Sequence, residues 1–109
     1  MSFNGNEGEV ISLETASGWT ANFRNSGTFD GINAIFYGMN KISSILNQEG
    51  CVGIRIYRAI DDDHNPVLVL VGTDENENDL LDGIIVERGT SCPPMCGGGG
   101  GLPPNPLQG

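Results

Sequence analysis

The chain has 109 residues and carries 14 acidic against 5 basic side chains, which gives a net charge of −9. This charge repels nucleic acid and anionic membrane surfaces, and the basic residues are too scattered to form a binding stripe. We therefore expect no nucleic-acid partner and no membrane partner. The length allows one domain of marginal size, which a partner or self-association would help to stabilise.

The N-terminal segment, residues 1–11, has neither a basic region nor an apolar core, so we do not expect a secretory signal. It is polar and contains glycine, and we expect it to be loosely ordered. The longest apolar run, Val67 to Val71, is too short to cross a bilayer. The expected location is the cytoplasm, unless a signal-independent route exports the protein.

Two helices are predicted in the first half of the chain. The first follows Ser12, a good N-cap residue, and ends at the turn-forming residues 25–27. The second covers roughly residues 40–48 and ends before Gly50. Its apolar face consists of Met39, Ile42, Ile45 and Leu46. Residues 28–38 fit either a helix or a loop.

Three apolar runs after Gly50 predict an antiparallel meander: Val52 to Ile60, Val67 to Val71, and Gly83 to Val86. Acidic turns separate the runs, and these turns lie at opposite ends of the sheet, so they cannot converge on one ion. The second run has no polar face and is best placed in the middle of the sheet.

The first run alternates, which predicts that Val52, Ile54 and Ile56 form a face buried under the helices. The expected fold class is α+β: two or three N-terminal helices packed on a three-stranded antiparallel meander. The expected division is a loose segment 1–11, a domain 12–89 and an extended Pro/Gly-rich C-terminal tail 90–109. Either the tail or a second subunit would cover the other face of the sheet.

Polar residues in the turns give no strong site. The segment Asp74-x-Asn76-x-Asn78 begins like a calcium-binding EF-hand loop, but Asp79 stands where glycine is needed and Ile85 where glutamate is needed. We therefore expect an ordinary turn. His64 is expected to be a solvated turn residue. Arg55 and Tyr57 could line a binding surface, although half-exposed strand positions are the commoner interpretation.

The tail contains Cys92 and Cys96 in the segment Cys-Pro-Pro-Met-Cys. Three hypotheses stay open for this pair: free thiols, a local disulfide, or a metal site shared between subunits. A zinc site within one chain would need Cys51 and His64 as further ligands. These two lie at opposite ends of a strand roughly 30 Å long, at about 3.3 Å per residue, so we expect no metal and no cofactor.

The sequence contains no motif of a known catalytic site. It has no GxSxG, no P-loop and no HExxH, and its five-glycine run lacks the Lys-Ser/Thr pair that a phosphate loop requires. We therefore expect a protein that is not an enzyme.

Several segments together resemble a family of small bacterial proteins. They are Leu13-Glu14-Thr15-Ala16, Trp19-Thr20, Phe23-Arg24, residues 48–57 with Gly-Cys-Val-Gly-Ile-Arg-Ile-Tyr, residues 68–72 with Leu-Val-Leu-Val-Gly, and Cys-Pro-Pro-x-Cys at 92–96. The resemblance covers residues 11–96 and implies a bacterial, single-domain protein. It assigns no activity, cofactor, partner or site residue. The glycine run and the Leu-Pro-Pro-Asn-Pro-Leu-Gln-Gly end are longer than the family pattern.

The leading functional hypothesis is a non-enzymatic structural or assembly protein that self-associates, with its tail packing on a neighbouring subunit of a homo-oligomer or filament. The expected interaction residues are Val67, Val69, Val71, Leu102, Pro103, Pro104 and Leu107. One alternative is an adaptor whose Pro-rich tail docks on another protein as polyproline II. Another is a metal-linked or redox-linked protein that uses Cys92 and Cys96.

Overall fold

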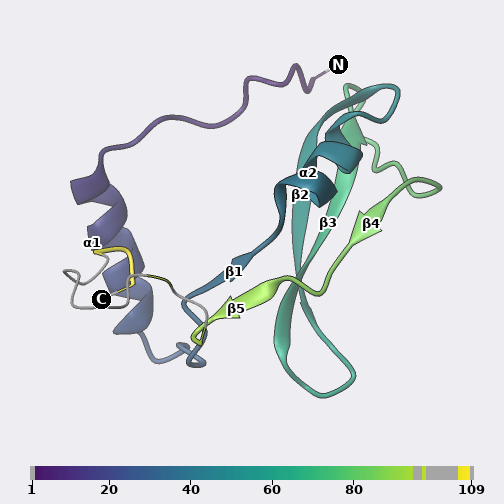
Figure 1. Ribbon diagram of the computed structural model, residues 1–109. Coiled ribbons are helices and arrows are strands. Elements are labelled where there is room, and N and C mark those ends of the chain that lie inside the picture. Colours follow the sequence, from purple (N-terminus) through teal and green to yellow (C-terminus); the bar gives the residue numbers. More distant parts are fainter. Residues whose placement is uncertain (1, 95–96, 98–105, 109) are drawn as a thin grey trace. The chain divides into compact units, whose positions relative to one another are not determined.

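The computed structural model describes residues 2–94, 97 and 106–108 (Figure 1). Its contacts divide the chain into two compact units. The first unit combines Met1–Gly8 with Tyr37–Gly89, and the second combines Glu9–Phe36 with Thr90–Gly109. This division differs from the predicted single domain 12–89, because the segment before Tyr37 makes its contacts with the C-terminal residues.

The first unit contains the predicted meander. Strands β2 (Cys51–Ile60), β3 (Pro66–Asp74) and β4 (Ile85–Val86) form an antiparallel sheet in the order β2-β3-β4. The central position of the all-apolar strand is confirmed. The predicted third strand is present but shorter, since only two of its residues pair with β3. The mixed α+β class is therefore confirmed.

Helix α2 (Met39–Leu46) packs on β2 and β3, in agreement with the helix predicted near residues 40–48. The core of the unit is small and centres on Ile45, which is fully buried, together with Leu70 and Val86. Half-buried side chains surround this cluster: Tyr37, Cys51, Ile54 and Leu68. Gly50 adopts a φ of +80°, which suits the chain reversal between the helix and β2.

The prediction that Ile56 is buried under the helices is wrong. Ile54 packs against the core, but the side chain of Ile56 is 57% exposed. A helix of eight residues is about 12 Å long, whereas a strand of ten residues is about 33 Å long. The β2–β3 hairpin therefore extends beyond α2, as Figure 1 shows.

The other face of the sheet is covered at one end by the N-terminal residues. The backbone amides of Ser2 and Phe3 donate to the carbonyl oxygen of Glu75, at 3.2 and 3.1 Å. The Phe3 ring lies under the guanidinium group of Arg55, with 5.4 Å between the guanidinium carbon and the ring centroid. The first residues of the segment predicted to be loose are thus held on the sheet.

Gln48 joins the end of α2 to the segment before β4. Its side-chain amide donates to the carbonyl of Ile45 at 2.9 Å and accepts from the amide of Ile84 at 2.8 Å. Gly72 in β3 lies directly beneath this connection. A Cβ atom added at Gly72 would lie 2.9 Å from Gln48 Nε2, 3.0 Å from Cys51 Sγ and 3.2 Å from Ile45 Cγ2.

We therefore expect Gly72→Ala to lower the free energy of unfolding by about 1–3 kcal/mol, because the methyl group overpacks the core. Gly53→Ala in the neighbouring strand is the matched control, since a Cβ there meets no atom within 4 Å. The control should be neutral or stabilising by up to about 1 kcal/mol, as expected for removing a glycine from a strand. Urea denaturation of both variants measures the difference. Equal effects would contradict the close packing at Gly72.

The second unit contains α1 (Leu13–Arg24) and a two-stranded antiparallel sheet. The Ser12 hydroxyl accepts a hydrogen bond from the amide of Thr15 at 3.0 Å, which confirms the predicted N-cap. Strand β1 (Ala34–Phe36) pairs with β5 (Thr90–Cys92). Residues 28–38, expected to be helix or loop, therefore contain a strand, and the first residues of the predicted tail form its partner. Each strand has three residues, too few for a periodic signal.

Candidate interaction surfaces

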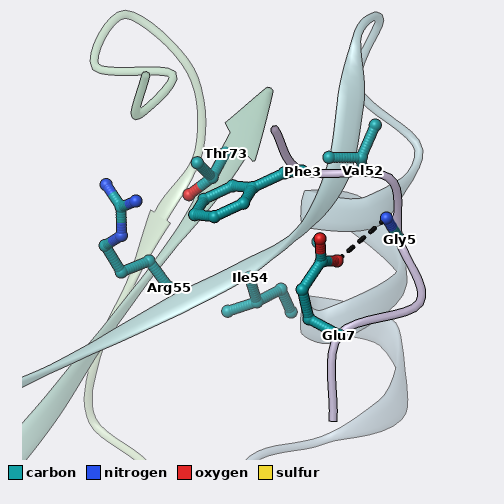
Figure 2. A pocket seen from close by; sticks show the side chains of 8 residues that line it. Phe3, Gly5, Glu7, Val52, Ile54, Arg55 and Thr73 are labelled. Carbon is teal, nitrogen blue, oxygen red and sulfur yellow. Dashed lines mark hydrogen bonds between the residues drawn. The ribbon is translucent and has the colours of Figure 1, made fainter. Parts of the chain in front are cut away.

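A cavity of about 300 Å³ lies in the first unit, between the N-terminal residues and the sheet. Its lining residues are Phe3, Gly5, Glu7, Val52, Gly53, Ile54, Arg55 and Thr73. Figure 2 shows the Phe3 ring beside Thr73 and the Glu7 carboxylate on the N-terminal segment, bonded to the Gly5 amide. The cavity exists because residues 2–7 lie across one end of β2.

Asp79 organises the polar residues next to this cavity. Its carboxylate accepts from Arg55 Nη1 at 2.8 Å, from the Thr73 hydroxyl at 3.0 Å and from the Tyr57 hydroxyl. The Asp79 side chain is 13% exposed and that of Arg55 34% exposed. The hydrogen bond from Tyr57, followed by those from Thr73 and Arg55, holds the pKa of Asp79 below its usual value.

The charged groups at the cavity are therefore engaged within the chain. The Glu7 carboxylate accepts from the amides of Asn4 and Gly5, both at 3.0 Å, and these bonds lower its pKa. Arg55 also donates to the carbonyl of Glu77 at 3.3 Å. This arrangement fastens the N-terminal segment and the 74–79 turn to the sheet. It leaves neither Glu7 nor Arg55 as a ready recognition group for a ligand.

The predicted face of Arg55 and Tyr57 is therefore a real cluster, but its centre, Asp79, was missed. The sequence feature that could have indicated Asp79 is its position at the end of an acidic turn that follows β3. The rest of that turn matches the prediction, since the Asp74 carboxylate accepts from the amides of Asn76 and Asn78, both at 2.9 Å. His64 lies exposed in the other turn, with a φ of +67°.

A second cavity, of about 350 Å³, lies in the second unit. It is lined by Trp19, Thr20, Phe23, Arg24, Asn33 and Leu107. Arg24 Nη1 donates to the Leu107 carbonyl at 2.8 Å, and Asn33 Nδ2 donates to the Gln108 carbonyl at 3.4 Å. Leu107, expected to contact a neighbouring subunit, here packs against α1 of its own chain.

Large apolar side chains are exposed on the first unit, on α2, on the sheet and on the segment before β4. Each of the following is at least 40% exposed: Met39, Leu46, Ile56, Tyr57, Ile60, Leu81, Ile84 and Ile85. Ile60 and Leu81 reach 72%. The unit therefore carries a substantial apolar surface that its own described residues leave uncovered.

The expected interaction residues fall into three groups. Val71 is only 3% exposed, so its inclusion in a contact surface is wrong: it packs within the sheet's own unit. Val67 and Val69 are half-buried. Leu102, Pro103 and Pro104 lie outside the described residues.

The cysteines divide between the two units. Cys92 is buried and disulfide-bonded, whereas Cys51 carries a free thiol. Cys92 is therefore neither a free thiol nor a thiolate metal ligand in this state. Cys96, the other member of the expected pair, lies outside the described residues, so the pairing itself stays a prediction. Within the described part of the chain, no three His, Cys, Asp or Glu side chains form a metal-binding group.

The chain matches no protein-family model, no curated protein sequence and no solved structure. The resemblance to a family of small bacterial proteins therefore stays a prediction. Of the helices in residues 2–94, neither has the length and apolar character needed to span a bilayer.

Proposed function

We propose that this protein is a non-enzymatic structural protein that self-associates, its exposed apolar side chains being covered by other copies. One observation carries the proposal. The first unit buries four large apolar residues, Ile45, Leu70, Val71 and Val86, but leaves the eight named above at least 40% exposed. A large exposed apolar area on a small protein is typical of a protein–protein contact surface.

The free energy gained by self-association depends on the apolar area that the contact removes from water. Removing apolar surface from water contributes about 25 cal/mol per Å², so covering several such side chains yields several kcal/mol before the cost of association is subtracted. The small core of the first unit would also gain stability from such a contact. The polar cluster around Asp79 supports a structural interpretation, since its groups bind one another.

In this proposal, the C-terminal tail of one copy also binds α1 of a neighbouring copy. Leu107 lines the cavity beside α1, and its carbonyl accepts a hydrogen bond from Arg24. A tail from a neighbouring copy would make the same contacts, which is the usual basis of domain swapping. The disulfide at Cys92 disfavours the metal-linked alternative, whereas the adaptor and the redox-linked alternatives stay predictions.

Sedimentation velocity on the full chain, over a wide concentration range and at low and high salt, tests the proposal. We expect the mass to rise from one chain of 11.5 kDa to larger species as concentration rises. High salt should strengthen association, because it screens the repulsion between chains of charge −9. A Leu107→Ser variant should associate less if the tail is exchanged. A mass of one chain under all conditions would contradict self-association.

A further inference from the structure

The outer edge of β2 is the longer of the two open edges of the sheet in the first unit, since β2 has ten residues and β4 has two. β3 pairs with one side of β2, and none of residues 2–94 pairs with the other side. Gly5 approaches this edge at Val52, since a Cβ added at Gly5 would lie 3.3 Å from the Val52 carbonyl oxygen. Farther along, Ile56 and Ile60 are 57% and 72% exposed. A long, exposed edge strand is a template for another strand.

The backbone of β3 reveals which of its residues turn away from β2. The carbonyl of Gly72 accepts from the amide of Leu80 at 2.8 Å, on the side of β4. The carbonyl of Leu68 accepts from the Tyr37 hydroxyl at 2.6 Å. In an antiparallel pair, two residues directly opposite either bond to each other or both point away. The β2 partners of these residues therefore point away from β3.

Arg58 is the direct partner of Leu68, and Ile56 and Ile60 occupy the same alternating position two residues to either side. Their amides and carbonyls face the open edge. The pairing of Ile60 with Pro66 agrees with this, since proline has no amide to donate and fits a position without a ladder hydrogen bond. The edge thus presents a regular row of backbone donors and acceptors between two exposed isoleucines.

We propose that this edge pairs antiparallel with β2 of a second copy, so that two three-stranded sheets form one continuous sheet across a two-fold axis. This inference rests on the self-association proposed above and identifies its contact surface. A two-fold axis sets β2 of one copy against β2 of the other. The backbone donors of each strand then face the backbone acceptors of the other strand.

The charges along β2 favour a second copy as the occupant. Arg58 lies in the outward-facing row of the strand, and the acidic turn Asp61–Asp63 follows it. An antiparallel alignment centred near Ala59 brings Arg58 of one copy alongside the acidic turn of the other, whereas an alignment centred on Arg58 would set the two arginines opposite each other. Although the whole chain is strongly acidic, this local arrangement is attractive. The exposed Ile56 and Ile60 side chains would be covered in the same contact.

Arg58→Pro tests the inference, because it removes an amide that points to the open edge while leaving the ladder to β3 intact. Arg58→Ala is the matched control, since it removes the same side chain but keeps the amide. In sedimentation experiments on the full chain, we expect the proline variant to associate at least about tenfold more weakly than the alanine variant, a loss of about 1.4 kcal/mol. Circular dichroism checks that both variants fold.

Should the proline variant fail to fold, Ile60→Lys provides the second test, because it adds a charge at an exposed edge position without removing a backbone group. It should weaken association to a similar extent. If wild-type protein associates and neither variant weakens it, the edge is not the contact surface, although self-association stands. If wild-type protein stays monomeric at every concentration, both the edge pairing and the proposed function are wrong.

Discussion

We expect Ile45→Ala to cause the largest loss of stability of any single truncation in the first unit. Ile45 is fully buried and lies at the centre of the small core, between α2 and the sheet. Truncating a buried isoleucine to alanine costs about 2–5 kcal/mol, since it removes buried surface and leaves a cavity. Small domains have a total stability of about 5–15 kcal/mol, so this variant should be close to unfolding.

Leu46→Ala is the matched control on the same helix. Leu46 is 44% exposed, and its truncation should cost less than about 1 kcal/mol. Urea denaturation followed by circular dichroism measures both variants, with the midpoint as the readout and the slope as a check on two-state behaviour. Similar shifts of the midpoint would mean that Ile45 does not anchor α2 on the sheet.

The second large effect is expected at Asp79. Asp79→Ala removes the acceptor shared by Arg55, Tyr57 and Thr73, and Thr73 is only 3% exposed. The buried hydroxyl is then left without this partner, which costs about 1–3 kcal/mol. The larger penalty of a fully buried ion pair does not apply, because Arg55 is 34% exposed. Asp82→Ala, at an exposed position, should be nearly neutral.

The pH dependence of stability gives Asp79 a distinct signature. Its pKa in the folded protein is lowered from 3.8, so its ionised form stabilises the fold above that pH. The contribution is lost as the pH falls below about 3.8 and passes the lowered folded pKa. Asp79→Asn should therefore flatten the fall in the free energy of unfolding on acidification. An unchanged slope would show that the carboxylate is not bonded as described.

The meander could be predicted from the sequence because its signals are local. The apolar runs of β2 and β3 are long, and an acidic, proline-containing turn separates them. The N-cap at Ser12 was also readable, since it depends on the next three residues. The pairing of β1 with β5 could not be predicted, because it joins two three-residue strands from distant parts of the chain.

On the candidate surfaces too, local patterns could be predicted from the sequence but contacts between distant residues could not. Alternation placed Arg55 and Tyr57 on one face, but it could not show that Asp79 folds back to bind both. Ile56 fitted the buried pattern, yet burial depends on how far α2 reaches along the hairpin. The open edge of β2 depends on sheet order and on hydrogen-bond alternation, neither of which a single strand's sequence contains.

Amide hydrogen exchange as a function of protein concentration tests the central claim, assembly through the β2 edge, most directly. The amides of Ile56, Arg58 and Ile60 should exchange rapidly in dilute protein and become protected as concentration rises. Those of Tyr57 and Ala59, which point toward β3, should be protected throughout and serve as the internal control. Rapid exchange of the three outward amides even in associated protein would contradict pairing at this edge.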